Sequence, residues 1–210
     1  MTIDVLLSGF APFGRAPLNE SWQAVQLAAR ELREQGVATQ IQELPVEFGT
    51  AGEQLAAAVR EHRPRLVVAT GLAAGRTGVT PERVAINVRD ARIPDNAGES
   101  PVDQPVVGAG PVGYFSTLPV KAMVSSLGEE PPVPGSVSQT AGTYVCNDVF
   151  YLLQHLLATD EGLAGIRGGF VHVPAAEELP VEDSARALVR MVLTALSTQQ
   201  DAPVAGGAEH

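Results

Sequence analysis

The chain has 210 residues, of which 45% are hydrophobic and 18% are charged. This length suits one domain with a substantial core, and the composition differs from that of chains that stay disordered. The formal net charge of −10 makes the protein a poor electrostatic match for phosphate backbones and for anionic lipid. The composition therefore argues against nucleic-acid and membrane roles.

Targeting signals and cysteine usage point in the same direction. No stretch of the chain reaches the roughly 18 to 20 apolar residues that a membrane span needs, and residues 1–10 lack both a cationic start and an apolar run of signal length. We therefore expect a cytoplasmic protein. The single cysteine, Cys146, excludes an intrachain disulfide, and one thiol with four histidines does not suit a typical structural zinc site.

The first part of the chain alternates short apolar runs with amphipathic segments. The predicted elements are, in chain order, a strand at 3–8, a turn-rich loop at 11–17, a helix from the cap Asn19 to Gly36, a strand at 39–44, a helix at 50–62 and a strand at 66–69. Continuously apolar strands that alternate with helices are typical of a parallel sheet covered on both faces. The predicted fold class is therefore α/β, with an open, twisted, mostly parallel sheet and helices on both faces.

Periodicity weakens between Gly71 and Pro119, where Gly, Pro and Asn are frequent. Such a long irregular stretch is usually functional or disordered, and its apolar residues favour the former. The remaining predicted elements are a strand at 83–88, a helix at 119–127, a short strand that starts at 137–138, a helix at 146–157, a strand at 168–173 and a helix at 181–196. We expect a single catalytic domain over residues 1–200 and a disordered tail over residues 201–210, which are small and polar.

Cys146 stands at the predicted start of the most regular helix of the chain. A thiol, whose ordinary pKa is about 8.5, becomes a good nucleophile when a helix N-terminus or a neighbouring imidazolium favours the thiolate. The turn at 140–145 offers backbone N–H groups that can bind an oxyanion forming beside the sulfur. This pattern is typical of acyl transfer, although a lone cysteine is also often buried and inert.

His172 is the best-placed base for such a thiol. It stands near the carboxyl end of a predicted strand, and ligands of open α/β sheets bind at those ends. His62 lies among arginines, His155 falls off the apolar stripe of its helix and is expected to be solvated, and His210 ends the tail. The alternative for His172 is a core histidine with satisfied hydrogen bonds.

Glu82 is the leading candidate for orienting that imidazole, a task that a carboxylate performs best. It lies in the loop after the third strand, and we expect it at the same sheet edge as His172. The sequence Thr80-Pro81-Glu82 is equally typical of a helix start, with Thr80 as N-cap and Pro81 at the first helical position. The local pattern leaves both interpretations open.

Two further segments bear on ligand binding. Phe10 and Phe13 lie in the loop after the first strand, where aromatic side chains line a pocket or pack in the core. Residues 71–76 contain glycines but lack the Gly-Lys-Ser/Thr sequence of a P-loop and do not match the dinucleotide fingerprint. Nucleotide binding therefore has only weak support.

Several motifs resemble, in chain order, the pyroglutamyl peptidase I family, also called pyrrolidone carboxyl peptidase. They are SGFAPFG (8–14), GR (75–76), TPERVAIN (80–87), ARIPDN (91–96), GP (110–111), YFSTLP (114–119), Ser138 with AGTYVCN (141–147), and GFVHVP (169–174). The similarity runs from the first strand to the last, and the motifs around Glu82 and Cys146 are long and specific.

The resemblance implies a cysteine peptidase that removes an N-terminal pyroglutamyl residue from peptides through a thioester intermediate. It implies the triad Glu82, Cys146 and His172, no metal or cofactor, an open twisted α/β/α sheet, and a cytosolic enzyme that is commonly a homotetramer. Peptides with N-terminal pyroglutamate are the implied partners.

The resemblance also implies a set of substrate-binding residues. Phe10, Phe13 and Tyr144 would form an apolar slot for the lactam ring, Arg92 would assist near the scissile carbonyl, and Asn19 would help to shape the entrance. For Arg92 the alternative is a surface ion pair with a neighbouring aspartate, Asp90 or Asp95.

The sequence departs from the family's usual pattern in two places. Ala74 stands where the family often has glycine, and residues 175–178 replace a bulkier aromatic or leucine segment after the His-Val-Pro motif. The second change can alter contacts beyond the lactam, and neither touches the implied triad. Two rival functions remain: a binding module that has lost turnover, and a phosphorylase-like protein whose phosphate cradle would need Arg76 and Arg92.

Overall fold

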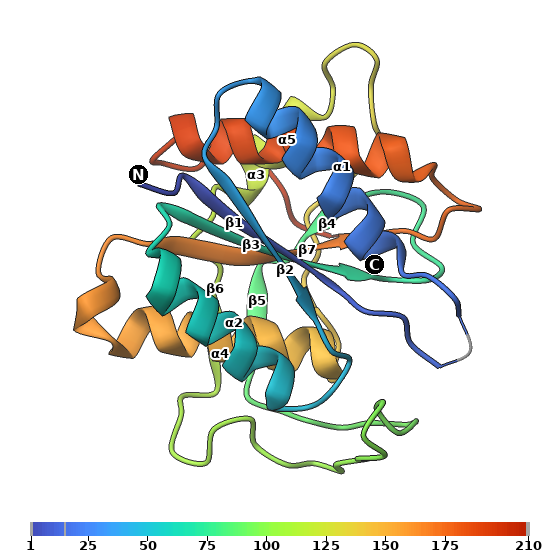
Figure 1. Ribbon diagram of the computed structural model, residues 1–210, viewed down its shortest axis with the longest axis vertical. Helices are drawn as coiled ribbons and strands as arrows, with labels where there is room; N and C mark the ends of the chain where they lie inside the picture. Colours follow the sequence, from blue (N-terminus) through green and yellow to red (C-terminus); the bar gives the residue numbers. More distant parts are fainter. Residues whose placement is uncertain (1, 15, 209–210) are drawn as a thin grey trace.

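The computed structural model describes residues 2–14 and 16–208, which form a sheet between two layers of helices (Figure 1). The main sheet has five strands in the order β2-β1-β3-β7-β4, and all neighbours pair in parallel except β4, which runs antiparallel to β7. Its strands are β1 (Val5–Phe10), β2 (Thr39–Leu44), β3 (Leu66–Leu72), β4 (Thr80–Pro81) and β7 (Arg167–Val173). The predicted α/β class with a mostly parallel sheet is confirmed.

Helices cover both faces of this sheet (Figure 1). One face carries α1 (Glu20–Glu34), α3 (Val120–Ser126) and α5 (Val181–Ser197). The other face carries α2 (Thr50–His62) and α4 (Val145–Thr159). A short 3-10 helix (Glu161–Leu163) follows α4. A separate two-stranded antiparallel sheet consists of β5 (Val84–Ile86) and β6 (Gly113–Phe115).

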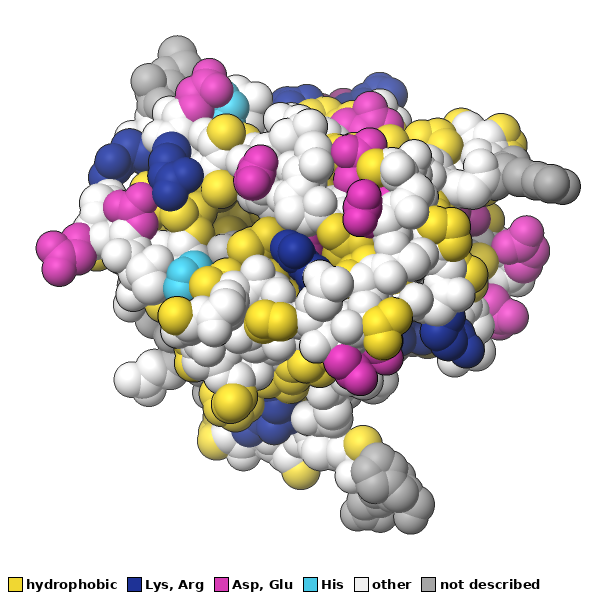
Figure 2. Space-filling model, turned by 90° about the horizontal axis from the view of Figure 1, so that it is seen from below, with side chains coloured by type: hydrophobic (Ala, Val, Ile, Leu, Met, Phe, Trp, Pro, Cys, Tyr) yellow, Lys and Arg dark blue, Asp and Glu magenta, His cyan; other side chains and the backbone are white. Residues whose placement is uncertain are grey.

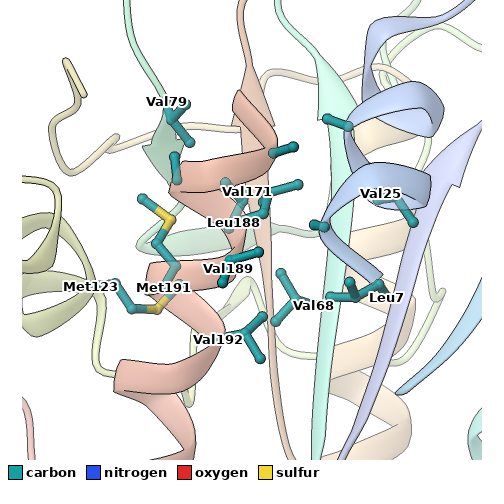
Figure 3. Packing of buried hydrophobic residues seen from close by; sticks show 14 of the residues in the cluster. Leu7, Val25, Val68, Val79, Met123, Val171, Leu188, Val189, Met191 and Val192 are labelled. Atoms are coloured by element: carbon teal, nitrogen blue, oxygen red, sulfur yellow. The ribbon is translucent and has the colours of Figure 1, made fainter. Parts of the chain in front are cut away.

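Alternate strand residues divide the core between the two faces. Leu7, Val68 and Val171 pack beneath α1 and α5, whereas their neighbours Leu6 and Val67 pack toward α2 and α4. Figure 3 shows the first of these layers, in which side chains of α5 meet those of β3 and β7. Because both faces are covered, every residue of β1 is buried, as its apolar sequence predicts.

Two short predicted strands differ from the structure. Residues 137–138 contribute only a bridge between Ser138 and Glu82 and belong to no described strand. The strand expected at 83–88 is shorter, because β5 pairs only with the three-residue β6 and lies outside the main sheet. A single-sequence pattern does not reveal such pairing partners, so these bounds depend on tertiary contacts.

The irregular segment between β5 and α3 is held by side-chain hydrogen bonds to backbone groups. The Asn87 amide donates to the carbonyls of Val107 and Gly110 and accepts from the Val107 N–H. The Asp95 carboxylate accepts from three backbone N–H groups, including that of Phe48 at 2.8 Å. These bonds replace the regular structure that the Gly- and Pro-rich sequence lacks.

Figure 2 shows the face that α2, α4 and this irregular segment form, where hydrophobic side chains are interspersed with polar surface. Within the irregular segment, Val102, Val112 and Phe115 are large hydrophobic residues with exposed side chains. Within residues 2–14 and 16–208, no helix has the length and apolar character needed to cross a membrane.

The C-terminal segment contacts the body of the protein over residues 201–208. The carboxylate of Asp201 accepts from first-turn N–H groups of α3, a helix that has no side-chain cap of its own. The carbonyl of Gly206 accepts from Arg83 at 2.7 Å. Composition alone predicts disorder here, but it does not reveal this capping. His210 lies outside the described residues.

Candidate active site

A pocket of about 240 Å³ opens where β1 and β3 end and α4 begins. Its position at the carboxyl ends of parallel strands is the one that open α/β sheets use for ligands. The pocket wall brings together five of the predicted site residues: Phe10, Phe13, Asn19, Tyr144 and Cys146. Its lining is Phe10, Phe13, Asn19, Val46, Leu72, Ala74, Ile93, Tyr144, Val145 and Cys146.

Aromatic rings form one side of this pocket. The ring centroids of Phe13 and Tyr144 lie 5.7 Å apart in an edge-to-face arrangement, and Phe48 packs on Tyr144 from outside the pocket at 5.2 Å. The Tyr144 hydroxyl donates to the carbonyl of Pro94 at 3.0 Å. Burial, together with the nearby Asp95 and Cys146, raises the pKa of Tyr144 to about 12, so the hydroxyl stays protonated at neutral pH.

Asn19 combines a helix cap with a place in the pocket wall. Its Oδ1 accepts from the backbone N–H of Ser21 at 3.1 Å and from the Ser21 hydroxyl at 2.7 Å, which confirms the predicted cap of α1. Its Nδ2 donates to the carbonyl of Ala11 at 3.0 Å. Because both polar ends of the side chain are already bonded, Asn19 contributes shape to the pocket.

The thiol of Cys146 lies directly against the backbone of β3. Cys146 is the second residue of α4, and a Cβ added to Gly71 would come within 2.8 Å of its Sγ. Gly71 is the register partner of His172 in the neighbouring strand β7. A glycine at this point therefore lets the sulfur approach the sheet beside the strand that carries the histidine.

His172 and Glu82 form a buried hydrogen-bonded pair. The Nδ1 of His172 lies 2.7 Å from Oε1 of Glu82, and their side chains are 5% and 0% exposed. The pair forms because β4 runs antiparallel to β7 and the Glu82 N–H donates to the carbonyl of Phe170. Since an ionised carboxylate only accepts, Nδ1 carries the proton, and the lone pair of a neutral imidazole is on Nε2.

This pairing decides between the two local interpretations of the Glu82 segment. Thr80 and Pro81 form strand β4, and no helix begins there. The helix-start interpretation is wrong, because the backbone of this segment pairs with β7 instead of closing a helical turn.

Burial dominates the electrostatics of the thiol and the imidazole. It raises the pKa of Cys146 to about 12, with a further contribution from Glu82, whereas Arg76 and the thiol's own backbone N–H act in the opposite direction. Burial also lowers the pKa of His172, although Glu82 opposes the shift. In the ligand-free protein both groups are therefore neutral, and desolvation outweighs the thiolate stabilisation expected from the helix N-terminus.

Two sequence-predicted residues lie elsewhere. Arg92 is exposed and contributes nothing to the pocket wall, although the adjacent Ile93 does. Within the described part of the chain it forms no ion pair, so the structure does not support the surface pair with Asp90 or Asp95, and a role near the scissile carbonyl stays a prediction. The expectation of a solvated His155 holds only in part, because the residue is half-buried, its Nδ1 lies 2.8 Å from the Tyr114 hydroxyl and its ring stacks on Tyr151.

Sequence reasoning missed the close approach at Gly71 and the apolar wall residues Val46 and Ile93. Gly71 carried a usable signal, since a glycine inside a buried strand often marks a close backbone approach. For metals, no cluster of three or more potential ligand side chains (His, Cys, Asp or Glu) occurs among the residues that the structure describes.

An α/β sheet that places a thiol at a helix start, near a strand histidine paired with a buried carboxylate, is typical of cysteine-type hydrolases. Comparison with known proteins agrees. Residues 3–202 match the family model described as pyroglutamyl peptidase. The chain therefore belongs to the pyroglutamyl peptidase family and is a cysteine-type hydrolase, so the resemblance found in the sequence is confirmed.

Individual relatives match over almost their whole length. The chain is 50% identical to a pyrrolidone-carboxylate peptidase of Streptomyces coelicolor, across 98% of this chain and 99% of that protein. It is 47% identical to one of Pseudomonas fluorescens, across 97% of each.

Solved structures match as well. The crystal structure of pyroglutamyl peptidase I from Bacillus amyloliquefaciens superposes with a TM-score of 0.89 at 36% identity, covering 95% of this chain and 100% of that chain. A mutant pyrrolidone carboxyl peptidase from the hyperthermophile Pyrococcus furiosus superposes with a TM-score of 0.82 at 34% identity, covering 92% and 98%. These matches extend over the sheet and both helical layers.

Proposed function

We propose that the protein hydrolyses the bond after an N-terminal pyroglutamyl residue of peptides, with Cys146 as nucleophile, His172 as general base and acid, and Glu82 orienting the imidazole. The observation that carries the proposal is the small, largely apolar pocket whose wall includes aromatic rings and the thiol. A pyroglutamyl group presents a flat, neutral lactam ring, which such a pocket suits.

The same pocket accounts for selectivity against ordinary peptides. A free N-terminus carries a charged ammonium group, and the described pocket wall contains no carboxylate to pair with it. Desolvating this charge without a partner is costly, so a peptide with an ordinary N-terminus binds poorly. A pyroglutamyl peptide avoids the cost because its nitrogen is part of the lactam.

The thiol and the imidazole are both neutral before substrate binds, so the thiol proton has to move to the imidazole for the sulfur to attack. His172 takes the proton of the Cys146 thiol as the sulfur attacks the carbonyl carbon of pyroglutamate. The negative charge that develops on the carbonyl oxygen is stabilised by N–H groups in the first turn of α4, which no side chain caps. Glu82 keeps the Nδ1–H of the imidazole in place and stabilises the imidazolium.

The second half of the reaction reverses the role of the imidazole. His172 gives its proton to the leaving amine as the carbon–nitrogen bond breaks, which leaves a thioester between Cys146 and the pyroglutamyl group. Water, deprotonated by the same imidazole, then attacks the thioester and releases pyroglutamate and the free thiol. The imidazolium gives the proton it took from water to the departing sulfur, so the thiol and the neutral imidazole are both restored.

A cytoplasmic location and a homotetramer are what the sequence and its resemblance imply, and both stay predictions. The phosphate-binding alternative loses support, because Arg76 is engaged by Glu82 and Thr140 and Arg92 lies outside the pocket wall.

The proposed specificity is tested with two anilides of similar ring size, one pyroglutamyl and one prolyl. We expect kcat/KM to be at least about 10³-fold higher for the pyroglutamyl anilide, which corresponds to roughly 4 kcal/mol for desolvating the prolyl ammonium. Initial rates of aniline release measure the ratio. Equal cleavage of both substrates would contradict the proposed pocket chemistry, and binding of the pyroglutamyl anilide without any turnover would favour the inactive binding module.

A further inference from the structure

The guanidinium of Arg76 contacts two parts of the site at once. Its Nη1 donates to Oε1 of Glu82 at 2.7 Å, and its Nη2 donates to the carbonyl of Thr140 at 3.0 Å. Nη1 also contacts the hydroxyl of Thr80, the β4 residue that is paired with His172. The planar group therefore joins the carboxylate of the site to the loop that leads into α4.

The Glu82 carboxylate needs such a partner because it is fully buried. Its Oε1 accepts from both His172 and Arg76 at 2.7 Å, whereas its Oε2 has no hydrogen-bond partner among the described residues. A buried carboxylate without a nearby cation is costly, and among the described residues only Arg76 and His172 form hydrogen bonds to this one. Arg76 offsets the charge and contacts the oxygen that faces the imidazole.

Arg76 achieves this from outside the substrate pocket. Its side chain is 27% exposed, and it is not among the residues that line the pocket beside Cys146. Only arginine suits the arrangement, because its rigid planar group donates to two acceptors at once, whereas lysine offers a point charge on a flexible stem. The effect of Arg76 on the reaction is therefore separable from substrate binding.

Building on the proposed function, we infer that Arg76 is a positioning residue for the reaction, which holds the Glu82 carboxylate against His172 and ties it to the loop at Thr140. No contact of Arg76 with substrate is required. A misplaced carboxylate would leave the imidazole free to turn, and the loss would appear in the chemical step.

The first test compares Arg76→Gln and Arg76→Lys with the wild-type enzyme on a pyroglutamyl anilide. We expect Arg76→Gln to lower kcat by roughly 10²-fold while KM changes less than about threefold. Arg76→Lys keeps the charge and loses the planar group, so its kcat should lie below that of wild type but within roughly tenfold of it. A wild-type kcat in Arg76→Gln, or a change confined to KM, overturns the inference.

A second test measures whether the effect of Arg76 on kcat depends on Glu82. A merely structural role of Arg76 would not produce this dependence. The two single variants, Arg76→Gln and Glu82→Gln, are compared with the double variant. Glu82→Gln should retain partial activity, and adding Arg76→Gln to it should lower kcat by less than about twofold. A loss of equal size in both backgrounds overturns the inference, because Arg76 would then act elsewhere. If Arg76→Gln does not fold, the same comparison is made with Arg76→Lys.

Arg60→Gln is the matched control. The Arg60 side chain is 56% exposed and pairs with Asp160 on the surface at 3.4 Å, so its loss should leave kcat unchanged. The outcomes also separate the two proposals. A wild-type enzyme that does not cleave the pyroglutamyl anilide contradicts the proposed function, whereas an active wild type with Arg76 variants that behave like it contradicts only the positioning role.

Discussion

Cys146→Ala and His172→Ala are each expected to lower kcat for a pyroglutamyl anilide by at least roughly 10⁴-fold. The first variant lacks the sulfur that attacks the carbonyl, and the second lacks the group that accepts its proton. The Cys146 side chain is small, and in His172→Ala the buried Glu82 carboxylate keeps Arg76 as its partner, so we expect the fold to persist. Initial rates measure the loss, and circular dichroism with thermal unfolding verifies the folded state.

The matched control for the histidine variant is His62→Ala. His62 lies in the last turn of α2, away from the pocket wall, and its loss should leave kcat within about twofold of wild type. Full activity in either Cys146→Ala or His172→Ala would show that the reaction uses other groups, and the proposed mechanism would have to be abandoned.

Gly71→Ala is expected to lower kcat by roughly 10²-fold, because a displacement of the nucleophile by about 1 Å has an effect of this size. The added Cβ would stand 2.8 Å from Sγ of Cys146 and 2.8 Å from the ring of Phe170. One of these groups must shift, and overpacking of this kind destabilises a fold by about 1–3 kcal/mol. Steady-state rates on folded protein and denaturant unfolding separate the two effects.

Gly108→Ala serves as the control for this substitution. A Cβ at Gly108 meets no heavy atom within 4 Å and the glycine has no positive φ, so both kcat and stability should match wild type. Retention of wild-type kcat by Gly71→Ala would mean that the reactive sulfur need not occupy the position beside β3.

Strong local patterns were sufficient to predict much of the fold. The bounds expected for β2 and α2 coincide with the structure, because their polarity patterns are bounded by clear turn signals. The start of α4 was also predicted to within one residue from its regular apolar stripe, since the helix begins at Val145 and the prediction placed Cys146 at its start. Phe10 and Phe13 were also predictable as pocket candidates, although Phe10 is the last residue of β1 and does not lie in the loop after it, where it was expected.

Features that depend on pairing between distant segments were not predictable. Thr80-Pro81-Glu82 is locally compatible with a helix start, and only pairing with β7 makes it a strand that delivers Glu82 to His172. The contact of Arg76 with Thr140 likewise joins segments that no local pattern relates. The neutral state of the thiol follows from burial, which becomes visible only when the layers are assembled.

The most direct test of the central claim is alkylation of Cys146, the one cysteine of the chain, with iodoacetamide while peptidase activity is followed. Burial raises the pKa of this thiol to about 12, so the alkylation rate should climb with pH through about pH 9 without levelling off. We expect cleavage of the pyroglutamyl anilide to fall in direct proportion to the label incorporated and to vanish at one label per chain. Complete labelling of Cys146 with undiminished cleavage would contradict the assignment of this sulfur as the nucleophile.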